Sequence, residues 1–276
     1  MRLAFAAAGP GRPTRLTGRY ASHPLAVARP TYGDPALPGL AQVHLLCTGA
    51  GVLAADRLRI EVELGPDAAV LLREVGATRI HPVGTPSARP ASLHMVFRLG
   101  AGSSLEWLPD PLIPFAGSRF RQTVEVELEP GACWIGGETV VAGRSARGER
   151  FAFAELDQSL VVRVGRSGPP LLAEAVHLRP ARFPLDGPAT LGSHTTWGTL
   201  RIVAPGRSAK TLMAELAALD HGSDVCCGAS ALAGDAGAVV RVLGATPQMV
   251  GAALHRAWDT ARQRYLGAAA PPSRRY

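Results

Sequence analysis

The chain has 276 residues, of which 47% are apolar and 18% charged, so it is long enough to bury a sizeable core. Its 31 glycines and 23 prolines indicate many turns and argue against a helical bundle. The formal net charge is +7, but the arginines are scattered rather than gathered with aromatic residues, which argues against nucleic-acid binding and favours an acidic protein partner.

The cysteines and the apolar runs bear on the location of the protein. Domains held by disulfides are short and rich in cysteine, whereas this chain has four irregularly spaced ones, Cys47, Cys133, Cys226 and Cys227. The N-terminal apolar run is shorter than the core of a signal peptide, and no run approaches the roughly 20 residues of a membrane span. We therefore expect a cytoplasmic protein with reduced thiols and no membrane partner.

Strict alternation of apolar and charged residues dominates the N-terminal part of the chain. Arg57–Leu64 (RLRIEVEL) and residues 123–128 (TVEVEL) place their apolar side chains on one face, which predicts half-buried antiparallel strands. A weak repeat accompanies them, because LGPDAAVLL, LGAGSSLEWL and LEPGACWIGG begin at Leu64, Leu99 and Leu128. A repeat of about thirty residues fits a stacked, solenoid-like architecture, but ordinary hairpins of an antiparallel sheet give the same pattern.

Prolines interrupt this pattern within residues 105–122, which read LEWLPDPLIPFAGSRFRQ. A central strand needs backbone donors throughout, and the segment lacks them at Pro109, Pro111 and Pro114. We expect the chain to leave one strand at Leu108, turn, and enter another near Phe120. Asp110 is then a contact within the turn or with a partner, and the apolar residues anchor the crossing to the core.

Helical periodicity is confined to the C-terminal third. Ser208 can cap a helix whose apolar positions are Leu212, Met213, Leu216 and Leu219. A longer helix is expected from Thr246, its N-cap, through Pro247 at the first position to Gly267 at its end. The sequence thus predicts a mainly β fold of stacked antiparallel sheets, β-helix-like, with about two C-terminal α-helices.

The same patterns predict the domain organisation. We expect a single domain over residues 1–276, with a β body at about 15–205 and a helix-containing part at about 206–267. The segment 268–276 (AAAPPSRRY) is expected to be a mobile tail unless a partner holds it.

Two glycine-rich stretches resemble nucleotide-binding motifs without their context. GAGVLA, residues 49–54, precedes a strand instead of the helix whose N-terminus holds a pyrophosphate. PGRSAKT, residues 205–211, lacks the glycines of a phosphate loop. Any GTPase chemistry therefore has to come from another chain.

Candidate metal ligands are few. HGSDVCC gathers His221, Asp224, Cys226 and Cys227, but adjacent cysteines rarely chelate one tetrahedral ion, so an incidental loop is the simpler interpretation. Four more histidines fall on strand-like segments, where a structural imidazole is the ordinary outcome: His44, His81, His94 and His177. Three acids stand out because they fall in or beside apolar segments, although ion pairs with nearby arginines would also explain Asp56, Glu138 and Glu149.

Four blocks of the sequence resemble the urease accessory proteins called UreD or UreH. In chain order they read GAGVLAADRLRIEVELGPDA, ATRIH, LEWLPDPLIPFAGSRFRQTVEVEL and GETVVAGRSARGERF. The resemblance runs from about residue 42 to residue 153, with a weaker match in LHRAWDTARQRYLG near the end. Its specific parts are the proline-rich block and the GRxxxGE run, with the signature residues Trp107, Pro109, Pro111, Pro114, Gly143, Arg144 and Gly148.

This resemblance implies a scaffold and not an enzyme. Proteins of the family are mostly β with a couple of helices, bind the helical protein UreF and through it the GTPase UreG, and are dimeric within that complex. The complex docks on the urease apoenzyme, and nickel released by the GTPase is thought to reach urease through a passage inside the UreD-type subunit. The resemblance therefore implies transient Ni²⁺ and no tightly bound cofactor.

Oxygen ligands suit such a passage, because carboxylates and hydroxyls hold nickel less firmly than clusters of imidazoles and thiolates do. We expect the passage to be lined by Asp56, Thr78, His81, Glu138 and Glu149. The family usually has two glycines where this chain has Ala54 and Ala55, which predicts an altered turn before Asp56. His81 also departs from the family pattern and is either a gained nickel contact or a neutral substitution.

A different class of function fits the same residues. A β-solenoid carbohydrate-active hydrolase or lyase would use Asp110, Glu138 or Glu149 as acid and base. A sugar cleft calls for exposed aromatic side chains, and only 5% of this chain is aromatic, which favours the scaffold.

Overall fold

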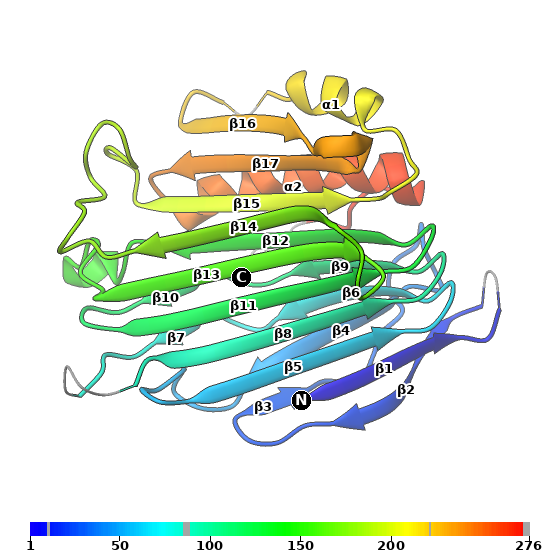
Figure 1. Ribbon diagram of the computed structural model, residues 1–276, viewed down its shortest axis with the longest axis horizontal. Helices are drawn as coiled ribbons and strands as arrows, with labels where there is room; N and C mark the ends of the chain where they lie inside the picture. The colour runs from blue at the N-terminus through cyan, green and yellow to red at the C-terminus, as the bar shows by residue number, and fades with distance from the viewer. Residues whose placement is uncertain (10–11, 85–88, 221, 273–276) are drawn as a thin grey trace.

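Two β-sheets lie face to face in the computed structural model, and two helices pack on the outer face of the larger sheet (Figure 1). The structure describes residues 1–9, 12–84, 89–220 and 222–272. His221 of the HGSDVCC segment and residues 273–276 of the predicted tail lie outside them. The prediction of a mainly β fold with two helices is confirmed.

The smaller sheet has seven strands. Its order is β14 (Pro170–Leu178), β13 (Glu155–Val164), β11 (Arg119–Leu128), β8 (Ala91–Leu99), β5 (Arg57–Leu64), β1 (Arg2–Ala7) and β2 (Thr14–Tyr20). Polar and charged side chains on its outward face contact one another across neighbouring strands, as His94 does with Glu125 at 2.9 Å and Arg98 with Glu63 at 3.1 Å. Such ladders keep this face in water while the apolar face is buried.

The larger sheet has ten strands. Its main order is β16 (Val225–Ala231), β17 (Gly237–Gly244), β15 (Thr196–Val203), β12 (Cys133–Val141), β9 (Ser104–Leu108), β6 (Ala69–Glu74), β4 (Ala41–Cys47) and β3 (Leu25–Val27). The short strands β10 (Leu112–Pro114) and β7 (Thr78–Ile80) pair with each other, and β10 also pairs with β12.

The repeat in the sequence marks successive coils of a solenoid. Strands β5, β8 and β11 each turn into the opposite sheet as β6, β9 and β12. The leucines that start the three repeats lie in register, since Leu64 pairs with Leu99 and Leu99 with Leu128. The solenoid-like alternative is therefore the correct one.

The central strands run parallel, so the predicted antiparallel pairing of Arg57–Leu64 and residues 123–128 is wrong. β5 pairs with β1 and β8, and β11 with β8 and β13, all in the parallel sense. Alternation reports that one face of a strand is buried, whichever way its neighbours run. Here each strand crosses to the other sheet before the chain returns, which makes neighbours parallel. Antiparallel pairs also occur, such as β13 with β14 at the edge of the smaller sheet and β12 with β15 inside the larger one.

Two hydrophobic cores hold the layers together. The first fills the space between the sheets and includes the fully buried side chains of Phe97, Phe120 and Trp134. The second lies between the larger sheet and the helices, where Trp258 packs with Leu200 and Val240. No helix among the described residues is long and apolar enough to cross a membrane.

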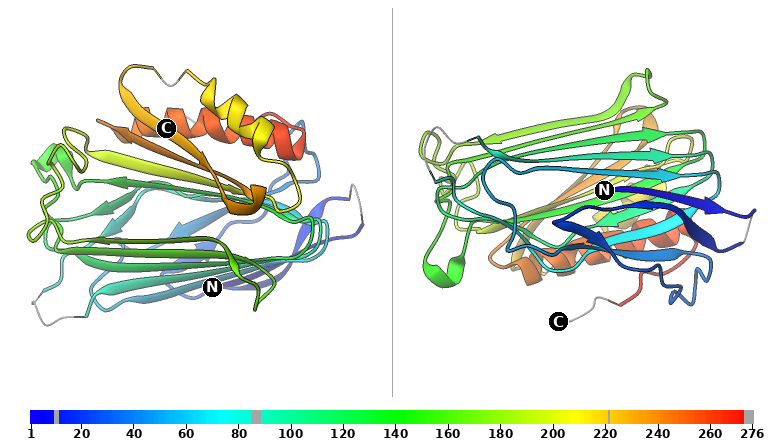
Figure 2. Two further views of the ribbon diagram at one scale, coloured as in Figure 1. Left: turned by 45° about the horizontal axis from the view of Figure 1, so that its top comes forward. Right: turned by 90° about the horizontal axis from the view of Figure 1, so that it is seen from below.

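Both predicted helices are present. α2 (Pro247–Leu266) begins after Thr246, whose hydroxyl accepts a hydrogen bond from the backbone nitrogen of Met249, and ends at Gly267 with φ of 69°. α1 (Lys210–Ala217) has Ala209 as its N-cap, one residue after the predicted Ser208. The views in Figure 2 show both helices on one side of the two layers.

The C-terminal segment folds back on α2 as far as it is described. Ala268 is buried, and the backbone nitrogen of Ala270 donates to Asp259 at 2.7 Å. The carbonyl of Pro271 lies 3.1 Å from the ring of His255. Residues 268–271 are thus held to the helix that precedes them.

The proline-rich segment behaves as its composition predicts. β9 ends at Leu108 and β11 begins at Arg119, with only the short β10 between them. The carboxylate of Asp110 accepts a hydrogen bond from the backbone nitrogen of Gly76 at 2.7 Å, and Trp107 is buried between the sheets. Asp110 is therefore a contact that joins two turns.

Candidate functional site

The residues predicted to line a passage fall into separate groups. Asp56 closes a turn, since its carboxylate accepts a hydrogen bond from the backbone nitrogen of Leu53 at 2.8 Å. Ala55 within this turn has φ of 67°, a left-handed conformation that glycine adopts more easily. The turn over Ala54 and Ala55 therefore contains a strained backbone position at Ala55.

His81 and Glu149 belong to a stack of side chains beside this turn. The ring of His81 contacts Phe115 edge-on at 5.0 Å, and the guanidinium of Arg144 lies 4.2 Å from the centre of the Phe115 ring. Arg144 pairs with Glu149, which also accepts from the backbone of Ala116 at 3.2 Å. The hydrogen bond from Arg144 lowers the pKa of Glu149 to about 2.

The signature residues Gly143 and Gly148 make this stack possible. Gly143 has φ of 140°, and a side chain there would approach the Cβ atom of Glu149 to 3.1 Å. Gly148 has φ of 72° and ends the short helical turn Ser145–Arg147. The GRxxxGE run is thus a turn that presents Arg144 to Glu149, which is a structural role.

Thr78 leads to an acid that the sequence did not single out. Its hydroxyl donates to Glu74 at 3.0 Å. Burial raises the pKa of Glu74 to about 7, with a smaller contribution from the charge of Asp110. Glu74 ends the apolar strand β6 (AVLLRE), where a terminal acid looks like an ordinary solvent-facing residue. Only the tertiary packing of the turns around Asp110 and Thr78 encloses it.

Three cavities lie around these acids. A cavity of about 350 Å³ lies under the turns at β4 and β7 and has Glu74 and Thr78 in its wall. A groove of about 920 Å³ runs between the proline-rich segment and α2, and Glu74 lines it as well. A third space, of about 40 Å³, lies between the two sheets. Pro109, Gly137 and Glu138 line both the groove and this interior space.

Each boundary between neighbouring cavities therefore contains a carboxylate. Glu74 separates the first cavity from the groove, and Glu138 separates the groove from the interior space. Burial raises the pKa of Glu138, while Arg201 opposes that shift. Of the five predicted residues, Thr78 and Glu138 line this row of cavities, whereas Asp56, His81 and Glu149 are not among the lining residues.

Glu138 belongs to a polar cluster inside the sandwich. The amide nitrogen of Gln158 donates to Glu138 at 2.8 Å and to Gln122 at 3.0 Å. Arg201 approaches Glu138 to 3.7 Å and binds Glu174 at 2.5 Å. These side chains come from five strands, β11 to β15, which is why local sequence patterns singled out Glu138 but could not indicate the cluster.

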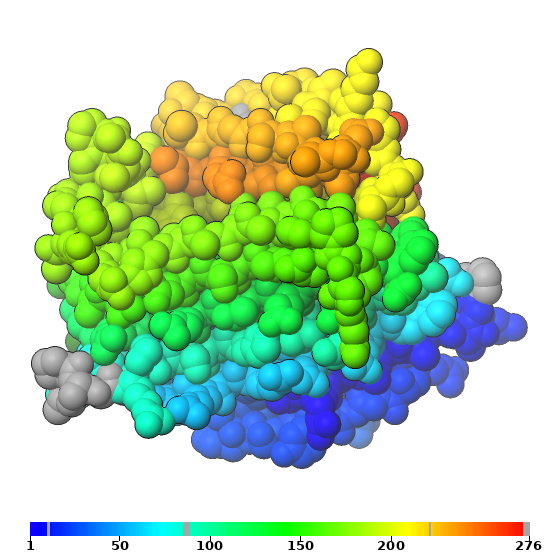
Figure 3. Space-filling model, in the orientation of Figure 1, coloured from blue at the N-terminus to red at the C-terminus, as the bar shows by residue number. Residues whose placement is uncertain are grey.

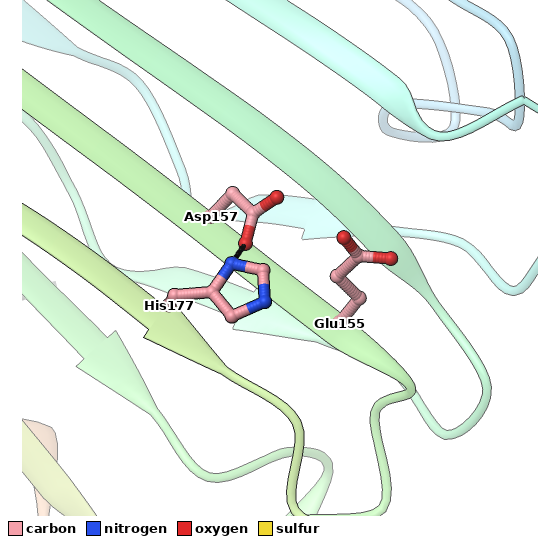
Figure 4. Close-up of side chains that lie close together, drawn as sticks. All are labelled: Glu155, Asp157 and His177. Atoms are coloured by element: carbon pink, nitrogen blue, oxygen red, sulfur yellow. Dashed lines mark ion pairs between the residues drawn. The ribbon is translucent and has the colours of Figure 1, made fainter.

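A second group of potential metal ligands lies on the outward face of the smaller sheet. His177 of β14 reaches across to Asp157 of β13, with Glu155 beside them (Figure 4). Both oxygens of Glu155 already accept hydrogen bonds from arginines, Arg119 at 2.9 Å and Arg179 at 2.9 Å. These ion pairs account for the cluster, and we assign it no metal.

The four cysteines form no disulfide among the described residues. Cys226 is exposed on the edge strand β16, and burial raises the pKa of its neighbour Cys227. Burial also raises the pKa of Cys133 to about 12. Neither Cys133 nor Cys227 is therefore a ready thiolate ligand at neutral pH.

Comparison with known proteins decides the family. The profile described as "UreD urease accessory protein" matches residues 1–276. The chain belongs to the UreD family of urease accessory proteins. It is 39% identical over 276 residues to urease accessory protein UreD 2 of Streptomyces griseus subsp. griseus, covering 99% of this chain and 92% of that protein.

Two further UreD proteins are similar over comparable lengths. The Haloarcula marismortui protein is 35% identical over 265 residues, or 95% of this chain and 86% of the relative. The Cenarchaeum symbiosum protein is 32% identical over 269 residues, or 96% of this chain and 92% of the relative. The relatives are named as accessory proteins, which agrees with a supporting role in urease maturation and gives the carbohydrate-enzyme alternative no support.

Proposed function

We propose that this chain is a nickel-delivery scaffold for urease maturation and has no catalytic activity of its own. In this role it binds a UreF-type helical protein and a UreG-type GTPase in the cytoplasm, forms a dimeric complex with them, and docks on apo-urease. Ni²⁺ then crosses the chain as a transient cargo. UreD membership supports the accessory role, and the row of cavities supports the transfer of an ion.

The acids at the cavity boundaries carry this proposal. A half-buried carboxylate attracts a cation, but a single carboxylate with neutral oxygen neighbours holds nickel loosely enough for it to leave. Glu74 with the hydroxyl of Thr78 is such a pair. Glu138 has the amide oxygen of Gln122 nearby, because the amide nitrogen of Gln158 donates to both side chains. The two acids lie at successive boundaries, so an ion can move from one to the next.

The test is nickel loading of purified apo-urease by the reconstituted accessory complex. We expect Glu74→Gln and Glu138→Gln each to leave the complex assembled and to lower the nickel content of urease several-fold. Glu125→Gln is the matched control, because Glu125 is an exposed acid on the outward face of the smaller sheet. Loading unchanged by both interior variants would contradict transfer through these cavities.

Asp56 gives a second arm of the same assay. Its carboxylate holds a turn, and Asp56→Ala is expected to lower loading while the complex still assembles.

Co-expression tests the scaffold itself. A chain that is monomeric and indifferent to a UreF-type partner would refute the proposed assembly.

A further inference from the structure

Arg201 faces the interior of the sandwich from the middle of β15. Its neighbours on the strand, Leu200 and Ile202, point toward the helices, so Arg201 points toward the smaller sheet. The side chain is 9% exposed. Its partner across the ladder is Gly136, which adds no side chain to the space that Arg201 enters.

Two carboxylates flank this guanidinium, and the side chain of Gln122 lines the same interior space. Glu174 accepts from its Nε atom at 2.5 Å, and an oxygen of Glu138 lies 3.7 Å from its Nη2 atom. Gln122 lies next to Glu138 through the bridging amide of Gln158. Carboxylate and amide oxygens are ligands that divalent cations accept.

The interior space limits what can occupy this ring. At about 40 Å³ it has room for about one water molecule, so a cation there must exchange most of its water for protein oxygens. In the structure, the positive charge of Arg201 compensates the two acids, Glu138 and Glu174. Glu174 has a second partner, Arg241 of β17, whose side chain is 60% exposed and lies outside the ring.

The Glu174 contacts also close the side of the sandwich. β14 is the free edge of the smaller sheet and lies next to β17 on the surface (Figure 3). Glu174 ties this edge to Arg201 and Arg241 of the larger sheet. The ring is therefore enclosed only while these ion pairs hold.

We propose that the guanidinium of Arg201 occupies the position of a divalent cation in a ring formed by Glu138, Glu174 and Gln122, and that a passing cation displaces it. This inference rests on the proposed function and adds a regulatory residue to it. A tethered cation keeps the two acids compensated when no ion is present. It also lowers the affinity of the ring, so that an ion which enters is released again.

Binding of Ni²⁺ to the purified full-length chain tests this role without urease. We expect Arg201→Met to gain one Ni²⁺ site per chain, with affinity at least tenfold above that of any site in the parent, measured by calorimetry. Arg241→Met is the matched control and should gain none. The triple variant Arg201→Met/Glu138→Gln/Glu174→Gln should lose the gained site.

A second variant protects the test against misfolding. Arg201→Gln keeps a donor for Glu174 but removes the charge, and it should gain the same site and be stabilised by Ni²⁺ in thermal unfolding. If both Arg201 variants are folded, as judged by circular dichroism, and bind no more Ni²⁺ than the parent, the inference is overturned. If both Arg201 variants are unfolded, the inference predicts that Ni²⁺ restores their folding. It is also overturned if Ni²⁺ does not restore folding and only the additional removal of Glu138 and Glu174 does.

The same variants separate this inference from the proposed function. A gained site together with slowed loading of urease supports both. A gained site with unchanged loading keeps the ring as a cation site but refutes nickel transfer through it. If the Arg201 variants gain no site while loading of urease still depends on Glu138, the role of Arg201 is refuted and the proposed function stands.

Discussion

The indole nitrogen of Trp258 lies 2.6 Å from a carboxylate oxygen of Glu106, which joins helix α2 to the middle of the larger sheet. Arg262, one turn further along the helix, binds Glu106 at 3.1 Å and also Asp34. All of these side chains are buried. Burial raises the pKa of Glu106, and Arg262 counteracts that shift. The helix that borders the groove is thus fixed by a buried ion network.

Removal of Arg262 should strongly destabilise the fold. Arg262→Ala leaves Asp34 and Glu106 as uncompensated buried acids, a loss of about 3–5 kcal/mol in the free energy of unfolding. Arg264→Ala, on the exposed face of the same helix, should change it by less than about 0.5 kcal/mol. Urea unfolding of the two variants measures the difference, and equal losses would show that the network contributes nothing specific.

The raised pKa of Glu74 should make stability fall with increasing pH. The folded chain binds a proton at Glu74 up to about pH 7, whereas the unfolded chain releases it near 4.5, so folding is favoured at low pH. Relative to Glu74→Gln, the parent should lose up to about 3 kcal/mol as the pH rises from 5 to 8. Chemical unfolding across this range checks it, and a constant difference between the two proteins would contradict the burial of this acid.

Glu149 should show the opposite pH dependence. Its pKa of about 2 means that its contribution is present above about pH 4.5 and is lost as the pH falls toward 2. Glu149→Gln should cost about 1–2 kcal/mol at pH 7, because it weakens charge-assisted hydrogen bonds with Arg144. Thermal unfolding should show the gap from the parent closing on acidification. Glu125→Gln, a control in an exposed pair, should show a small effect throughout.

The turn before Asp56 offers a stabilising substitution. Ala55 has φ of 67°, where an alanine costs about 1–2 kcal/mol relative to its preferred region. Ala55→Gly should therefore raise the free energy of unfolding by about 0.5–1 kcal/mol, even though glycine adds flexibility to the unfolded chain. Ala54→Gly pairs with it as the control, because Ala54 is not at positive φ and should gain nothing. A gain at both positions would refute the conformational explanation.

Local patterns in the sequence determined many individual elements. Thr246, Pro247 and Gly267 fix the bounds of α2 through capping chemistry that needs no tertiary partner. Pro109, directly after Leu108, ends β9 for an equally local reason, the missing backbone donor. The spacing of Leu64, Leu99 and Leu128 marked the coils, since a repeated turn recurs at each corner of a solenoid.

Tertiary structure decided the direction of the strands and the composition of the interior. Alternation is the same in parallel and antiparallel strands, so only the crossing of the chain between two sheets made β5, β8 and β11 parallel. Glu74 became an enclosed acid because the distant turn at Asp110 packs against the turn that follows β6. Glu138, Glu174 and Arg201 lie on separate strands and come into contact only in the folded chain. Their pairing compensates charges that would be costly to bury alone.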